Sequence, residues 1–202
     1  MNASLWSEIV SLSIEHVELV LIAIAVAAAI GLPLAVLLTR RRGPRRFAVG
    51  FANIAQTIPS LALFGFLVPF VGIGKTTAII ALCLYALLPI LRNTLTGILG
   101  VDHAVSESAL AMGMTRRQTL WQVELPLAMP SIVSGLRIAT VTTIGTATIA
   151  AAIGAGGLGV FIFRGISMFD RPTVLAGAIP AAVLALAADE VLEWIERRLS
   201  PA

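Results

Sequence analysis

Long uncharged stretches, separated by short clusters of charged residues, dominate the pattern of the sequence. The first covers residues 19–39 and is 21 residues long, which is enough for a helix to cross a hydrocarbon core of about 30 Å. A second uncharged stretch follows at residues 47–70. Three largely apolar stretches with a few charged residues follow at 76–99, 131–153 and, from 172 or 173, to 194. This pattern predicts an all-α integral membrane protein with five transmembrane helices.

Composition supports the same fold class. The chain is 58% hydrophobic and 12% charged, with a mean hydropathy of +0.96, whereas soluble domains contain roughly 25% charged residues. A soluble fold of 202 residues could not bury so much apolar surface. The single cysteine, Cys83, excludes a disulfide framework, and the two histidines are far apart, so no metal site is predicted.

The basic residues predict the orientation in the membrane, because cytoplasmic loops are enriched in Lys and Arg. The five-span reading places nine of them on one side: Arg40, Arg41, Arg42, Arg45, Arg46, Arg116, Arg117, Arg197 and Arg198. Lys75, Arg164 and Arg171 fall on the other, and Arg92 and Arg137 lie inside spans. We therefore expect an external N-terminus and a cytoplasmic C-terminus. The predicted parts are an external segment 1–16, a transmembrane domain 17–195 and a cytoplasmic tail 196–202.

One long polar interruption lies between the third and fourth spans, at residues 102–130. Asp102 is a predicted N-cap for a helix over 103–112, and Gly113 is suited to a left-handed C-terminal position. Thr115 and Gln118 have the spacing of a capping box, which predicts a second helix over 116–124. Proline at 126 and 130 should then interrupt the helix. The expected product is a cytoplasmic helix–turn–helix.

The same loop resembles the EAA signature of binding-protein-dependent ABC importer permeases. Glu107, Ala109 and Gly113 are followed after nine residues by Val123, and then by Leu125-Pro126. Ser108 and Val123 depart from the usual Ala and Ile. The resemblance implies the type I ABC importer permease fold and a loop that docks into a groove on a separate ATPase subunit. Leu120, Trp121 and Val123 are expected to offer apolar contacts to that partner.

Further stretches are similar to permeases of osmoprotectant importers, at residues 56–70, 87–98 and 154–180. That subfamily implies a path for glycine betaine, choline, carnitine and related quaternary ammonium compounds in the bacterial cytoplasmic membrane. It also implies a second permease, either a copy or a paralogue, a dimer of ATPase subunits and a separate extracytoplasmic binding protein. The alternatives are an amino-acid permease of the methionine type and a membrane scaffold without a substrate path.

Two nucleotide- or nucleic-acid-binding interpretations are disfavoured. Arg116 and Arg117 are too few basic residues for a DNA-reading helix–turn–helix, and apolar spans flank the loop. The G-x-G-x-x-G run at 154–159 follows a predicted membrane helix and not a strand, so it does not indicate a dinucleotide site. No G-x-x-x-x-G-K-[ST] loop is present. We therefore expect no catalysis and no cofactor in this chain, with ATP and Mg²⁺ bound by the partner ATPase.

Polar residues inside the second span are the candidate translocation path. Asn53, Gln56, Thr57 and Ser60 fall at i, i+3, i+4 and i+7, which is one face of a helix, with a kink expected at Pro59. Thr143 in the fourth span is a further candidate. The polar face serves either the path or interhelical packing. A separate expectation is that Arg92 or Arg137 pairs with Asp189 or Glu190, because an unpaired charge in a span is costly.

Overall fold

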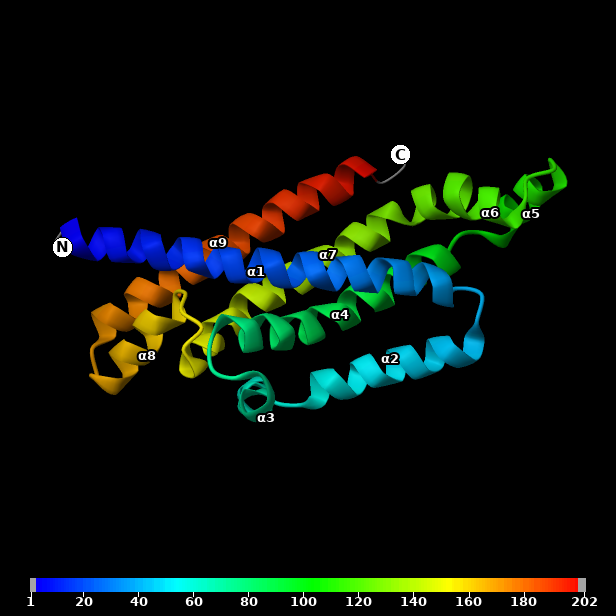
Figure 1. Cartoon of the computed structure of the whole chain (residues 1–202). Helices are drawn as coiled ribbons and strands as arrows, with labels where there is room; N and C mark the ends of the chain where they lie inside the picture. Colours follow the sequence, from blue (N-terminus) through cyan, green and yellow to red (C-terminus); the bar gives the residue numbers. More distant parts are fainter. Residues whose placement is uncertain (1–2, 200–202) are drawn as a thin grey trace.

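The computed structural model describes residues 3–199, and these form a bundle of long helices (Figure 1). The α-helices are α1 (Ala3–Leu38), α2 (Arg42–Thr57), α3 (Ser60–Val71), α4 (Lys75–Leu99), α5 (His103–Ala111), α6 (Arg116–Thr119), α7 (Leu125–Ala150), α8 (Gly159–Ser167) and α9 (Arg171–Leu199). A π-helical turn, Leu120–Glu124, joins α6 to α7, and a 3₁₀ turn, Ala151–Ile153, follows α7. No strand occurs among the described residues, so the predicted all-α class is confirmed.

Four runs of helix are long and apolar enough to cross a membrane. They are Leu5–Leu38, Lys75–Leu99, Arg116–Ile153 and Arg171–Leu199. The pair α2 and α3 passes the same test only as one broken span, because its two halves meet at an angle of 101°. Counting that pair as one span gives the five that the sequence predicts.

The helix α4 lies at the centre of the bundle, between α1 and α7 (Figure 1). Leu19, Phe64 and Leu82 bring α1, α3 and α4 into one buried cluster with small residues of α7. The crossing of α4 and α7 is unusually close, since a Cβ on Gly135 would lie 2.7 Å from the Cβ of Asn93. Glycine at this position therefore sets the distance between the two central helices.

The helix α1 is longer than the sequence predicts. The structure joins the expected N-terminal segment and the first span into a single helix from Ala3 to Leu38. Its acidic residues have partners on other elements: Glu8 pairs with Arg164 at 2.9 Å, and Glu18 pairs with Lys75 at 3.1 Å. Glu15 accepts a hydrogen bond of 3.2 Å from the backbone N–H of Gly157. These contacts give each of the three carboxylates in the first half of α1 a partner on another element of the bundle.

The prolines at 126 and 130 do not end the helix, which corrects the sequence-based prediction. The helical run continues from Arg116 to Ile153. The π-helical turn lies directly before Pro126, and the Leu125 N–H donates to the Leu120 carbonyl, five residues earlier. A wider turn leaves room for the proline ring and changes which carbonyl needs a donor. The predicted interruption is therefore a local widening of one continuous helix.

Two smaller features also differ from the prediction. The predicted second span is not a kinked helix, because it breaks at Ile58-Pro59 into α2 and α3. The helix α8 lies between the fourth and the last spans, where no helix is predicted. The glycine-rich run before α8 forms a turn against α1, as the hydrogen bond from Gly157 to Glu15 shows.

Candidate functional site

The loop formed by α5 and α6 lies at one end of the bundle, beside the α1–α2 turn and opposite the start of α1 (Figure 1). Its helix ends follow the predicted chemistry. The Asp102 carboxylate accepts from the Ala104 N–H at 2.9 Å, and Thr115 with Gln118 forms a complete capping box. Gly113 has φ +88°, which is the left-handed conformation expected where α5 ends. The helix α5 ends at Ala111, one residue earlier than predicted.

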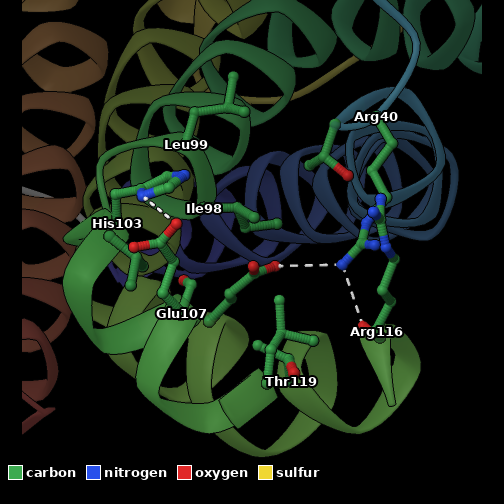
Figure 2. A pocket seen from close by; sticks show the side chains of 12 residues that line it. Arg40, Ile98, Leu99, His103, Glu107, Arg116 and Thr119 are labelled. Carbon is green, nitrogen blue, oxygen red and sulfur yellow. Dashed lines mark hydrogen bonds and ion pairs between the residues drawn. The ribbon is translucent and has the colours of Figure 1, made fainter. Parts of the chain in front are cut away.

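A cavity of about 350 Å³ separates this loop from the bundle (Figure 2). The Arg40 guanidinium, at the end of α1, donates to the Arg116 carbonyl at 3.0 Å and lies 3.8 Å from the Glu124 carboxylate. Arg40 therefore connects the turn after α1 to the start of α6 and to the end of the π-helical turn.

The exposed side chains of the loop divide between the cavity and the surface beyond it. Glu107 and His103 line the cavity and lie 3.4 Å apart, and the Glu107 side chain is 67% exposed (Figure 2). Met112, which follows α5, is 78% exposed, and Trp121 of the π-helical turn is 55% exposed. Ala109 of α5 is only 2% exposed. The loop thus has an accessible carboxylate at the cavity and, separately, two exposed large apolar side chains.

The remaining predicted loop residues divide between partner-facing and inward-facing positions. Leu120 and Leu125 pack against the buried cluster of Ile98, Ala128 and Ile132. Leu120 is only partly buried in this contact, so its expected contact with a partner stays a prediction. Val123 is half-buried and Pro126 is exposed.

The candidate path residues are separated by the break between α2 and α3. Asn53, Gln56 and Thr57 are exposed on α2, whereas Ser60 begins α3 and does not share their face. The Gln56 side chain donates to the Tyr85 carbonyl at 2.9 Å, and Tyr85 donates its hydroxyl to the Ile58 carbonyl at 2.5 Å. These reciprocal hydrogen bonds hold the break against α4. The polar face therefore contributes to packing as well as to an open surface.

Two cavities lie along this surface, and both are lined by Arg92. The first, of about 410 Å³, is lined by Arg45, Arg46, Val49, Gly50, Asn53, Arg92, Leu95, Thr96 and Leu99. The second, of about 400 Å³, is lined by Gln56, Tyr85, Leu88, Pro89, Arg92, Asn93, Ile138, Thr142 and Thr146. Thr57 and Ser60 line neither cavity, and the hydroxyl of Thr57 bonds to its own helix at the Ile54 carbonyl.

Thr143 is not on the cavity surface. Its side chain is buried, and its residue is 1% exposed. Thr142 and Thr146, one residue before and three after it, line the second cavity instead. A shift of one residue rotates a helical side chain by roughly 100°, so Thr143 is buried within this chain, and its assignment to the path stays a prediction.

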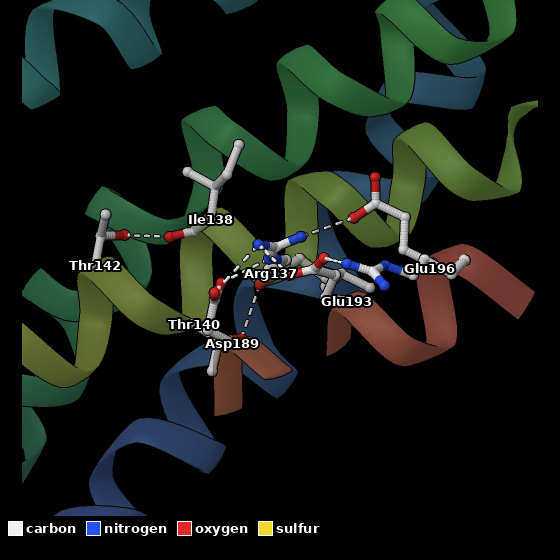
Figure 3. Close-up of polar contacts among 9 residues, drawn as sticks. Arg137, Ile138, Thr140, Thr142, Asp189, Glu193 and Glu196 are labelled. Carbon is white, nitrogen blue, oxygen red and sulfur yellow. Dashed lines mark hydrogen bonds and ion pairs between the residues drawn. The ribbon is translucent and has the colours of Figure 1, made fainter. Parts of the chain in front are cut away.

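A second polar cluster joins α7 to α9 (Figure 3). The Arg137 guanidinium lies 2.5 Å from Asp189, 2.9 Å from Glu193 and 3.5 Å from Glu196. The expected pairing of an arginine within a span with Asp189 is confirmed for Arg137. Glu190 is not part of this cluster, whereas Glu193 and Glu196 follow Asp189 at i+4 and i+7, on one face of α9.

Sequence reasoning missed several residues of these surfaces. Tyr85, Arg92 and Asn93 were not assigned to the path, although residues 85, 92 and 93 share a helical face at i, i+7 and i+8. Arg40 was counted only as a cytoplasmic marker. Its role depends on the contact between chain segments 76 residues apart, and no local pattern indicates such a contact.

Comparison with known proteins places the whole chain in one group. The family described as "Binding-protein-dependent transport system inner membrane component" matches residues 20–201. The chain is 45% identical over 188 residues to the choline transport system permease protein OpuBB of Bacillus subtilis, covering 93% of this chain and 87% of that protein. It is 48% identical over 176 residues to the glycine betaine/carnitine/choline transport system permease protein OpuCD of the same organism, covering 87% and 77%.

A similar protein occurs in another bacterium, and solved structures share the fold. The osmoprotectant import permease protein OsmY of Salmonella typhimurium is 43% identical over 189 residues, which cover 93% of this chain and 80% of that protein. A structure of the MetNI methionine ABC transporter, inward facing, matches with a TM-score of 0.89 and 25% identity over 100% of both chains. An amino acid ABC transporter with histidines matches with a TM-score of 0.79 at 20% identity, over 95% and 94%.

Proposed function

Because this chain belongs to the family of inner membrane components of binding-protein-dependent transport systems, we propose that it is the permease through which an ABC importer moves osmoprotectants across the bacterial cytoplasmic membrane. The proposed substrates are quaternary ammonium compounds such as glycine betaine, choline and carnitine. The observation that supports this class is the sequence identity of 43% to 48% with three permeases, over most of each chain. Two of them are named for choline or for glycine betaine, carnitine and choline, and the third is named for osmoprotectants.

The energy is proposed to come from a separate ATPase subunit that binds ATP and Mg²⁺. The exposed carboxylate of Glu107 at the loop cavity and the exposed apolar side chains of Met112 and Trp121 support a docking surface on the α5–α6 loop. The contacts of Arg40 with Arg116 and Glu124 support transmission of ATPase motion into α1 and α7. Two ATPase subunits, a second permease and an extracytoplasmic binding protein complete the proposed importer.

The translocation path is proposed to follow the two cavities beside α4. Asn53 and Gln56 of α2 line one cavity each, Arg92 of α4 lines both, and Thr142 and Thr146 of α7 line the second. Polar side chains on three helices are what a hydrated path through lipid requires, because polar groups facing hydrocarbon are costly. A second permease facing this surface would close the path.

Reconstitution tests the proposal. The chain is purified with its ATPase and second permease, placed in liposomes with the binding protein outside, and supplied with ATP inside. We expect uptake of labelled glycine betaine, carnitine or choline, and no uptake of labelled methionine. Methionine uptake in place of these compounds would support the amino-acid alternative. Assembly without uptake of any compound would support the scaffold alternative.

The coupling loop is tested in the same system with Glu107→Lys. This change reverses the charge of an exposed side chain, so we expect normal membrane insertion together with loss of substrate-stimulated ATP hydrolysis. Glu190→Lys is the matched control, because this carboxylate has no ion pair among the described residues and lies outside the loop. Normal stimulation in the Glu107 variant would remove the loop from the coupling mechanism.

A further inference from the structure

The cavity beside Tyr85 contains a cation that has no counter-charge in the described chain. The Arg92 guanidinium makes no hydrogen bond or ion pair with residues 3–199, in contrast to Arg137, which contacts three carboxylates. Arg92 lies on α4, about 10 Å along the helix from its end at Leu99. An unpaired charge at such a position is costly and marks a substrate or ion pathway.

The other residues around Arg92 define what this charge could bind. None of the described residues lining the two cavities carries a carboxylate. A purely cationic ligand would therefore meet repulsion from Arg92 with no compensating negative group. An anionic group, and a carboxylate in particular, would meet a guanidinium that can donate two parallel hydrogen bonds.

The second cavity also has an aromatic side chain on its wall. Tyr85 is the only tyrosine of the chain, and its hydroxyl is held by the Ile58 carbonyl at 2.5 Å. Its ring lines the cavity that Arg92 also lines. Aromatic rings attract quaternary ammonium groups. One cavity thus combines a group suited to a quaternary ammonium with a group suited to a carboxylate.

We propose that the cavity between Tyr85 and Arg92 is a transit site for zwitterionic quaternary ammonium carboxylates, and that Arg92 makes the permease favour these over the plain cation choline. This inference rests on the proposed function, since it names the substrate class of the proposed path. Four neutral polar side chains also line this cavity, namely Gln56, Asn93, Thr142 and Thr146. Each donates a hydrogen bond to a backbone carbonyl, so what it has left to offer a passing ligand is chiefly an acceptor oxygen. Glycine betaine and carnitine have the required carboxylate, and choline does not.

The test compares initial uptake rates of glycine betaine, carnitine and choline at equal saturation of the binding protein. In the wild-type complex, we expect choline to be the slowest of the three. We expect Arg92→Gln to slow glycine betaine and carnitine several-fold more than choline, and Arg92→Lys to retain most of the wild-type ratio. Arg42→Gln is the matched control, because Arg42 is exposed at the start of α2 and lines neither cavity. Its ratio should equal that of the wild type.

Three results would overturn the inference. In the wild-type complex, without any substitution, choline uptake as fast as glycine betaine uptake would refute the preference directly. An equal loss for all three substrates in Arg92→Gln would assign Arg92 to structure. A loss that varies with the anionic lipid content of the liposomes, and not with the substrate, would assign it to a lipid headgroup. If the wild type imports none of the three compounds, the proposed function itself fails and this inference falls with it.

Discussion

At the scale of single residues, Gly113 controls the angle between the two loop helices. Its φ of +88° lies in the left-handed region, and no other atom lies within 4 Å of the position that a Cβ would occupy. A side chain here would therefore meet no steric clash, and its whole cost is conformational, about 1 kcal/mol or more. The strain would act on the loop without disturbing the packing of the bundle.

We expect Gly113→Asp to insert normally but to abolish substrate-stimulated ATP hydrolysis, because the strained turn reorients α5 and adds a charge at the docking surface. Gly113→Asn should be milder, since Asn adopts left-handed conformations more readily than most residues. Gly43→Ala is the control, as that position is equally open and its glycine has no positive φ. Hydrolysis is measured with loaded binding protein, and full stimulation in Gly113→Asp would show that the angle is unimportant.

In the cluster of Arg137 and its three carboxylates, loss of the arginine and loss of one acid should have unequal effects. Arg137→Gln would leave Asp189, Glu193 and Glu196 close together, with Arg197 paired to one of them. Asp189→Asn would leave Arg137 with two carboxylates. Because like charges repel and an unpaired charge in a span is costly, we expect Arg137→Gln to reduce the yield of folded complex several-fold more than Asp189→Asn does.

The measurement is the fraction of monodisperse complex after extraction in detergent. The swap of Arg137→Asp with Asp189→Arg should recover part of the loss seen with Arg137→Asp alone. Equal yields for Arg137→Gln and Asp189→Asn would contradict the role of the arginine as the shared partner of three acids.

At the scale of elements, the break between α2 and α3 depends on α4. Two hydrogen bonds cross this junction, from Gln56 to the Tyr85 carbonyl and from the Tyr85 hydroxyl to the Ile58 carbonyl. The Ile58 carbonyl needs such a donor, because the turn into Pro59 interrupts the helical pattern of α2. The 101° bend is thus fixed by contacts with a neighbouring helix and not by the proline alone.

We expect Gln56→Leu to reduce uptake while the complex still assembles, because it removes both a polar wall of the cavity and one of these hydrogen bonds. Tyr85→Phe, which removes only the other bond, should show a smaller reduction of the same kind. Thr57→Val is the control, since this hydroxyl bonds within its own helix and lines neither cavity. Loss of assembly in Gln56→Leu would assign the polar face to packing alone.

At the scale of the whole molecule, the two ends of the bundle differ in charge. The arginines at 40–46, Arg116 and Arg117 lie at the end that holds the α5–α6 loop, and the start of α1 lies at the opposite end (Figure 1). An end enriched in arginine is expected to face the cytoplasm. The proposed orientation is therefore N-terminus outside and C-terminus inside.

Cysteine labelling of intact cells tests this orientation. In a Cys83→Ala background, which removes the only native thiol, single cysteines are placed at positions 3, 43 and 202. We expect an impermeant reagent to label position 3 alone, and to label positions 43 and 202 after permeabilisation. Labelling of positions 3 and 202 from the same side would contradict an odd number of spans.

The sequence by itself determined the class of the protein, the number of spans and the local chemistry of the loop. Apolar stretches long enough to cross lipid leave few other folds, and the capping residues Asp102, Thr115 and Gln118 bond to groups at most three residues away in the chain. Such signals are local, so they can be identified without a structure. The residue spacing from Glu107 to Pro126 likewise indicated the family resemblance.

Only the tertiary structure decided which side chains meet. It placed Thr142 and Thr146 on the cavity in place of Thr143, packed Leu120 against a buried cluster and continued the helix through Pro126. Each outcome depends on a neighbour distant in the chain or on a π-helical turn that changes the rotation of later residues. Periodicity assigns residues to a common face, but the rotation of that face is set by packing between helices, and this is why Arg92 and Tyr85 became visible as one site only in three dimensions.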